Sequence, residues 1–386
     1  MVVLLQDKSK SFSIPVPDIM FTDSCNFRCK YCFEKKNQHT IETEKMKQYI
    51  RDRLCLEIYI FGGEPLIVLD TLIEILDEID NLEDISEERK LLLLHSAKKI
   101  TTNGSLIKKY KNKLKKYGFE VQISCDGPKE IHDANRIYAD GRPTYDDVFE
   151  SIQICKKNKI AWAVHGVVGK NTICKIFDIF KWFWEVEKLR AKNIEQAIFN
   201  MGNNEFQIIF EEDYDDNDVN EIIKQFHKII EWIYNCEELT EEQRKKLFNR
   251  WMERKGGICG VGTGLMAIDY KFDIYPCHRL AAVEDKGKYK LGNVYDIDSF
   301  SNFALYNLYF RVAKRDKLQY SAYTVNNAYN DSIHNWFNWC PSTNIQESKG
   351  NPYYISAKYS IMHNELNQAL HELKELYFPE VKKLTW

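Results

Sequence analysis

Apolar and polar positions alternate with two different periods along the first 170 residues. Short apolar runs predict strands at 18–24, 57–61, 98–102, 120–124 and 161–168. Apolar positions spaced three and four residues apart predict helices at 43–54, 70–79, 106–117 and 144–157. Strands that alternate with helices pair in parallel through right-handed crossovers. We therefore expect an α/β fold, a partial (β/α)6 barrel of the TIM type.

The sequence after residue 170 has a different pattern. A sixth strand is predicted at 206–210, an amphipathic helix at 177–184, and further helices at 238–251 and 360–377. Residues 256–354 are rich in loops and in Asn, Tyr and Trp. We expect four parts: a barrel over 1–235, a linking helix over 236–258, a small loop-rich domain over 259–345 and a C-terminal helical segment over 346–386.

Composition excludes several classes of protein. The chain has 386 residues, 44% of them hydrophobic, and a net charge of −3, which gives no electrostatic case for nucleic acid. No apolar stretch approaches the ~20 residues of a membrane span, and the apolar start is too short for a signal peptide. We expect a cytosolic protein with no membrane partner. Its eleven cysteines are then ligands or core residues rather than disulfides.

Three cysteines follow the first predicted strand in a C-x3-C-x2-C pattern: Cys25, Cys29 and Cys32. Composition alone predicts about 0.01 such matches in a chain of this length. Three thiolates at this spacing can hold three irons of a [4Fe–4S] cube and leave the fourth iron open. Zinc is the alternative, but three ligands do not close a structural zinc site. Loops after barrel strands build active sites, so the pattern lies where chemistry is expected.

This segment resembles the radical S-adenosylmethionine superfamily, whose motif is C-x3-C-x-aromatic-C, with Tyr31 as the aromatic residue. The resemblance implies that the open iron chelates S-adenosylmethionine. An electron from the cluster then breaks the S–C5′ bond, and the 5′-deoxyadenosyl radical abstracts a hydrogen atom from substrate. By the same analogy Phe33 lies beside the adenine. The cofactors carry the chemistry, while the protein positions and shields them.

Polar turns after the next strands extend the resemblance. Gly62-Gly63-Glu64-Pro65 resembles the GGEP motif that holds the methionine amino group, and its glycines allow close backbone approach. Thr102-Asn103 ends the third strand, and Ser124, Asp126 and Arg136 follow the fourth. These segments resemble maturases related to anaerobic sulfatase-maturating enzymes. The resemblance, which covers about residues 15–170, implies ribose and carboxylate contacts, with Ser124 and Arg136 the leading candidates.

The C-terminal part resembles a SPASM domain, which carries auxiliary iron–sulfur clusters. Cys259, Cys277 and Cys340 are the ligands that this resemblance implies. Phe272 replaces the usual hairpin glycine, and the cysteine run for a second auxiliary cluster is missing, so the smaller twitch type fits better. A fourth ligand then comes from substrate, water or a side chain such as His278. The alternative is a degenerate domain without a cluster.

No catalytic base stands out. Cys125 follows the fourth strand, and His165 lies on the fifth, so both are candidates to face the substrate cavity. A histidine that is satisfied within the barrel wall is the alternative for His165. The other cysteines lack ligand spacing and are expected to be core or incidental residues.

The resulting prediction is a radical S-adenosylmethionine enzyme that acts on a peptide or protein, a maturase of ribosomally made peptides being the leading case. Partners would be that peptide and an external one-electron reductant. Few residues precede the first strand, so leader capture would fall to the C-terminal region, the acidic segment 213–218 or a separate leader-binding protein. An enzyme acting on a small metabolite is one alternative, and a non-catalytic iron–sulfur sensor is another.

Overall fold

The computed structural model describes nine stretches of the chain: residues 17–51, 58–88, 90–91, 98–201, 206–208, 214–252, 266–283, 286–296 and 357–381. They fall into two compact units, each built from separate stretches. The first unit takes its residues from 1–124, 136–163 and 260–312, and the second from 125–135, 164–259 and 313–386. The four-part division along the chain stays a prediction.

A parallel sheet forms the centre of the first unit. Its first four strands are β1 (Asp18–Thr22), β2 (Ile58–Gly62), β3 (Lys98–Thr102) and β4 (Phe119–Ser124). Each is parallel to the next, with Ile19 opposite Ile60 and Ile100 opposite Val121. The strands predicted from the apolar runs are confirmed, and the mixed α/β fold with a parallel sheet is consistent with a partial barrel.

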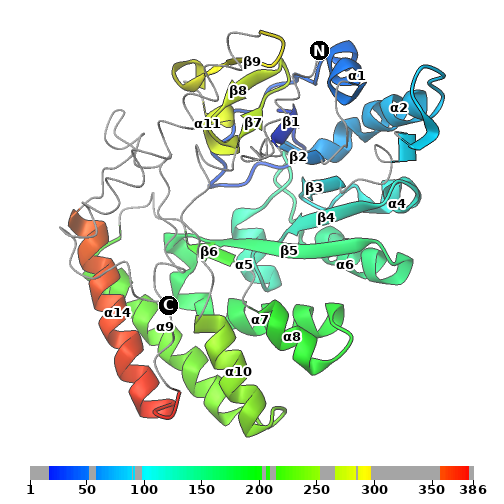
Figure 1. The fold of residues 1–386 in the computed structure, drawn as a ribbon. Coiled ribbons are helices and arrows are strands. Elements are labelled where there is room, and N and C mark those ends of the chain that lie inside the picture. The colour runs from blue at the N-terminus through cyan, green and yellow to red at the C-terminus, as the bar shows by residue number, and fades with distance from the viewer. Residues whose placement is uncertain are drawn as a thin grey trace, which may run out of the picture. The chain divides into compact units, whose positions relative to one another are not determined.

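Amphipathic helices accompany these strands. They are α1 (Thr43–Arg51), α2 (Leu69–Asp80), α4 (Ile107–Lys116) and α6 (Tyr145–Asn158). Figure 1 shows α1, α2 and α4 together on one side of the strands, and α1 packs against α2 and α4 against α6. Their apolar faces are buried, as Leu76 and Leu114 illustrate.

The two faces of β3 and β4 differ. Ile100, Val121 and Ile123 are fully buried, whereas the alternate residues are accessible. The side chains of Lys99 and Glu120 are 48% and 46% exposed and lie 3.8 Å apart as an ion pair. A closed barrel would fill this second face with packed side chains. An accessible, charged face is what an incomplete barrel predicts.

A C-terminal hairpin extends the same sheet. β7 (Ala267–Ile268) is parallel to β1, and β8 (Asp273–Tyr275) and β9 (Gly292–Asn293) follow in antiparallel order. The first unit thus has the strand order β4-β3-β2-β1-β7-β8-β9. Phe272 ends the hairpin turn with a φ of 66°, a backbone conformation that residues other than glycine rarely adopt. It is fully buried, and its ring lies 5.8 Å from Tyr49 and 5.4 Å from Tyr295.

The second unit is mainly helical. It contains most of β5 (Ala161–Val168), which is parallel to β6 (Phe206–Ile208). Its helices are α5 (Lys129–Asn135), α7 (Ile176–Arg190), α8 (Ile194–Asn200), α9 (Asp216–Asn235), α10 (Glu241–Met252) and α14 (Ala357–Tyr377). Aromatic side chains fill its core, with Trp251 lying 5.5 Å from Phe180 and 5.4 Å from Phe226. The short helices α5 and α8 were not predicted.

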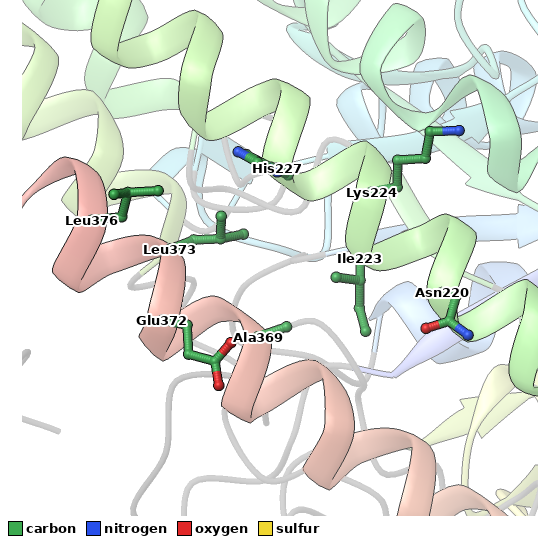
Figure 2. A pocket seen from close by; sticks show the side chains of 8 residues that line it. All are labelled: Asn220, Ile223, Lys224, His227, Ala369, Glu372, Leu373 and Leu376. Atoms are coloured by element: carbon green, nitrogen blue, oxygen red, sulfur yellow. The ribbon is translucent and has the colours of Figure 1, made fainter.

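Helix α14 packs along α9, and a groove of about 430 Å³ runs between them (Figure 2). Its lining is half apolar, with Ile223 from α9 facing Leu373 from α14. Asp215 caps the N-terminus of α9. The Asp215 side chain accepts hydrogen bonds from the N–H groups of Asn217 and Asp218 at 2.9 and 3.0 Å, as in a capping box.

No helix in the described stretches is long and apolar enough to cross a membrane.

Candidate functional site

The cysteine loop, residues 25–36, leaves the carboxyl end of β1. Phe27 anchors it: the ring is 1% exposed and meets Tyr138 edge-on at 4.8 Å. The backbone of Arg28 donates to Ile137 O at 2.8 Å, and its guanidinium caps Cys25 O at 2.7 Å. The loop therefore has a defined path that one buried aromatic residue and a few backbone bonds fix.

The three predicted ligand cysteines all lie on this loop and are half-buried. Phe27 N–H points at Cys25 Sγ from 3.4 Å. Burial raises the pKa of the Cys25 thiol to about 12, and the Lys36 ammonium opposes that rise. Within the described stretches, no group of three or more His, Cys, Asp or Glu side chains is arranged to hold a metal ion. The assignment of these thiols to a cluster stays a prediction.

The donor set nevertheless fits a cluster. Three thiols on one loop supply the number and type of ligand that an iron–sulfur cube needs. An N–H that points at a ligand sulfur is the kind of outer contact that tunes such a centre. Coordination would deprotonate the Cys25 thiol despite its raised pKa, because a metal inverts the local preference for the neutral form.

Gly62 and Gly63 bring the end of β2 against the end of β1. Gly62 has a φ of 113°, and a Cβ at Gly63 would clash with the backbone of Ser24. Gly63 N–H donates to Thr22 O at 2.8 Å, and the next N–H, from Glu64, donates to Ser24 O at 2.7 Å. The glycines thus allow a close approach of the chain to itself, and a close approach to a ligand stays a prediction.

Glu64 is buried, and its carboxylate accepts three hydrogen bonds. Its Oε1 accepts Thr102 Oγ1–H at 2.7 Å and Leu66 N–H at 3.1 Å, while Oε2 accepts Asn103 N–H at 2.7 Å. Burial raises its pKa to about 7, and these donors oppose that rise. The carboxylate was expected to meet an ammonium group. Two of these hydrogen bonds, from Thr102 and Asn103, join the turn after β2 to the turn after β3, and the third, from Leu66, lies within the turn after β2. A contact with an ammonium group stays a prediction.

A side-chain network ties the turn after β3 to the cysteine loop. Asn103 Nδ2 donates to Asn26 Oδ1 at 2.8 Å, and Asn26 Nδ2 donates to Ser105 Oγ at 2.9 Å. Ser105 closes the triangle by donating to Asn103 Oδ1 at 2.7 Å. Asn26 and Ser105 were missed as site residues, although Asn26 lies inside the cysteine motif.

Arg136 and the motif aromatics complete the part of the site in the first unit. Arg136 is 7% exposed, and its guanidinium lies 5.3 Å from the Tyr31 ring centre. Phe33 is 41% exposed, with the Arg279 guanidinium 5.4 Å from its ring centre. Ser124 is half-buried at the end of β4.

Three predicted residues belong to the second unit. Cys125 and Asp126 are completely buried, and Cys125 N–H donates to His165 O at 2.9 Å. Asp126 Oδ1 accepts Val167 N–H at 3.0 Å. These contacts stabilise the junction between the turn after β4 and β5. His165 itself is half-buried.

Of the predicted auxiliary ligands, Cys259 and Cys340 lie outside the described residues. Cys277 is 3% exposed at the start of α11 (His278–Ala282). His278, the suggested fourth ligand, has Nδ1 3.0 Å from Asp18 Oδ2. The auxiliary cluster stays a prediction.

A family model described as the radical SAM superfamily matches residues 19–183, the stretch that carries the cysteine loop and its neighbouring turns. This match confirms the resemblance to the radical SAM superfamily that the sequence motifs predict. The radical SAM family implies a [4Fe–4S] cluster and S-adenosylmethionine.

Two curated proteins are similar to part of the chain. The radical SAM cyclopropyl synthase TigE of Paramaledivibacter caminithermalis is 28% identical over 186 residues, which cover 42% of this chain and 36% of that protein. The cysteine-type anaerobic sulfatase-maturating enzyme of Clostridium novyi is 29% identical over 177 residues, which cover 42% and 46%. The match therefore spans less than half the length of either relative.

A solved radical SAM structure, native anSMEcpe with bound AdoMet and Cp18Cys peptide, resembles the chain with a TM-score of 0.58. The two are 18% identical, and the match covers 94% of this chain and 100% of that one. At this identity the likeness shows the fold.

Proposed function

We propose that this radical SAM protein cleaves S-adenosylmethionine reductively and uses the resulting radical to modify a side chain of a peptide or protein, as a maturase. The observation that carries the proposal is that the turns after β2 and β3 bond to the cysteine loop and to the residues just before it. Gly63 and Glu64 bond to the end of β1, and Asn103 bonds to Asn26 within the cysteine motif.

In this proposal Cys25, Cys29 and Cys32 ligate the cluster. When bound, the cluster supplies the electron that breaks the S–C5′ bond of S-adenosylmethionine. The chain positions that bond. Backbone groups around Gly62 and Gly63 receive the methionine ammonium, since the Glu64 carboxylate is mostly committed to the chain. Arg136 is the leading contact for the methionine carboxylate.

Two further features support a chain-like substrate. The accessible face of β3 and β4 carries Lys99 and Glu120 as a loose ion pair, together with Thr101 and Gln122, whose side chains bond at 3.2 Å. Amide, hydroxyl and charged groups of both signs suit a peptide backbone and polar side chains better than an apolar metabolite. The Clostridium novyi relative is named for maturing a sulfatase, which is a protein.

The decisive experiment is anaerobic reconstitution followed by mass spectrometry. Wild-type protein with dithionite should form 5′-deoxyadenosine, and the Cys25→Ala/Cys29→Ala/Cys32→Ala variant should not. Cys174→Ala is the matched control because Cys174 is exposed and lies outside the motif. Formation of 5′-deoxyadenosine by the triple variant at the wild-type rate would contradict the central assignment.

The peptide part of the proposal has its own test. Candidate peptides should show a mass change that requires both S-adenosylmethionine and the three cysteines. A loss of two hydrogens would indicate a crosslink, and deuterium uptake without another change would indicate epimerisation. Turnover of a small metabolite, without binding of any candidate peptide, would favour the metabolite enzyme. Absence of any S-adenosylmethionine cleavage would favour a sensor.

An auxiliary cluster is also proposed. Reconstituted wild-type protein should hold about eight irons, as two cubes of four. The Cys259→Ala/Cys277→Ala/Cys340→Ala variant should hold about four. About four irons in both proteins would mean that the C-terminal part carries no cluster.

A further inference from the structure

The base of the cysteine loop is closed by bonds between its two ends. Thr22 Oγ1–H donates to His39 O at 2.6 Å, and Ser24 Oγ–H donates to Asn37 O at 3.2 Å. His39 N–H donates to Asp23 Oδ1 at 2.8 Å. The residues on either side of the loop therefore form a neck, so the loop cannot open without breaking several bonds.

Asp23 and His39 are the centre of this neck. Asp23 is 5% exposed, and its Oδ2 lies 2.7 Å from His39 Nδ1 and 3.3 Å from Asn37 Nδ2. The carboxylate thus accepts hydrogen bonds from both the backbone N–H and the ring Nδ1 of His39. A buried carboxylate with several donors holds its partners in one arrangement, because each lost bond would leave a desolvated acceptor.

A residue of the C-terminal hairpin stacks on one face of the imidazole, and the His39 side chain is 50% exposed. The Tyr270 ring stacks on His39 with 4.6 Å between ring centres and 11° between planes. The same residue accepts Glu42 N–H through its backbone oxygen at 3.2 Å. Lys286 lies 4.5 Å from the Tyr270 ring centre and forms a 2.7 Å ion pair with the buried Asp269. A continuous set of contacts runs from the hairpin through Tyr270 and His39 to Asp23, two residues before Cys25.

We infer that Tyr270 and His39 are positioning residues that hold the cysteine loop closed around its iron–sulfur cluster. The inference rests on the proposed cluster at Cys25, Cys29 and Cys32. All three proposed ligands come from this one loop, so opening its neck would misplace them together. The hairpin thereby serves the radical centre although it lies about 240 residues away in the sequence.

The test compares Tyr270→Leu and His39→Gln with two matched variants. Tyr270→Phe keeps the stacked ring and should behave as wild type. Tyr275→Phe lies in the same hairpin and loses its 3.3 Å bond to Asp269, but Tyr275 has no described contact with His39. The main readout is the rate of iron release from reconstituted protein to a ferrous chelator, well below the unfolding temperature. The EPR spectrum of the reduced cluster and the unfolding midpoint of the iron-free chain accompany it.

Tyr270→Leu and His39→Gln should release iron about tenfold faster, at the low end of what outer-shell changes cost, and should alter the EPR spectrum. Tyr275→Phe should lower the unfolding midpoint without changing the release rate. Wild-type release by both Tyr270→Leu and His39→Gln would overturn the inference, as would equal acceleration by Tyr275→Phe. If the wild-type protein forms no cluster through the motif cysteines, the proposed function fails instead. Should Tyr270→Leu not fold, His39→Gln and Tyr270→Phe decide the matter.

Discussion

The backbone N–H of Asn103 donates to Glu64 Oε2 at 2.7 Å, so that one buried carboxylate joins the turns after two neighbouring parallel strands. Thr102 bonds to the other oxygen of the same carboxylate at 2.7 Å. Glu64 is therefore a structural residue of the site. It joins the turn after β3, which bonds to Asn26 of the cysteine loop, to the turn after β2, which bonds to Thr22 and Ser24 just before that loop.

The free energy of unfolding of the chain should depend on pH through the protonation of Glu64. Burial raises its pKa from the ordinary 4.5 to about 7. Between these values the folded chain holds a proton that the unfolded chain has lost, so this group makes stability fall as the pH rises. The contribution is on the order of 3 kcal/mol. Denaturation of the cluster-free chain at several pH values should therefore show the wild type losing its advantage over Glu64→Gln between about pH 4.5 and 7. A constant difference across that window would contradict the raised pKa.

A methyl group at Gly63 should disturb the contact between β1 and β2. A Cβ there would meet the backbone oxygen of Ser24, which no side-chain rotation can relieve. Gly63→Ala should lose about 1–3 kcal/mol of folding free energy, as overpacked sites do, and most of its 5′-deoxyadenosine formation. Gly287→Ala is the control, since nothing lies within 4 Å of a Cβ at that position. The two variants should differ in both denaturation and product formation, and equal behaviour would show that the close approach is unimportant.

Much of the first unit could be predicted because its signals are local. The alternation of apolar residues fixed β3 at Lys98–Thr102 and β5 at Ala161–Val168, and both predictions match the structure residue for residue. The cysteine motif and the glycine turn are equally local, and parallel pairing brings the ends of their strands together.

The remaining features depend on partners that are distant in sequence. The ligand contact predicted for Glu64 stays a prediction, but its hydrogen bonds with Thr102 and Asn103 are visible only in the fold. The stacking of Tyr270 on His39 joins segments without any shared pattern. The short helix α5 has too few residues for a clear period.

At position 272, we expect a substitution to glycine to destabilise the chain less than a substitution to alanine. Its backbone lies at φ 66°, which costs an ordinary residue about 1–2 kcal/mol and glycine almost nothing. Its buried ring packs between Tyr49 and Tyr295, so truncation removes about 3–5 kcal/mol. Phe272→Gly loses the packing but relieves the backbone, while Phe272→Ala loses the packing and keeps the strain. Chemical denaturation should give the order wild type, then Phe272→Gly, then Phe272→Ala, and the reverse order of the two variants would contradict the strain.

We expect Cys125 and His165 to have different roles at the proposed site, one structural and one in contact with the substrate. The Cys125 thiol is completely buried, and its Sγ lies 3.7 Å from Gly127 O within its own turn. A group that exchanges hydrogen with a substrate must be reachable, so we expect Cys125 to be structural. His165 is half-buried and remains the better candidate to face a substrate.

Substrate turnover distinguishes these roles once a substrate is in hand. Cys125→Ala should cost about 1–2 kcal/mol of stability through the small cavity it leaves, with product yield per 5′-deoxyadenosine unchanged. His165→Gln should still cleave S-adenosylmethionine but yield less modified product per cleavage, because a contact to the substrate rather than to the cofactor is lost. Comparing 5′-deoxyadenosine and peptide product in the same reaction measures this coupling directly. Loss of coupling in Cys125→Ala, with full coupling in His165→Gln, would reverse the two assignments.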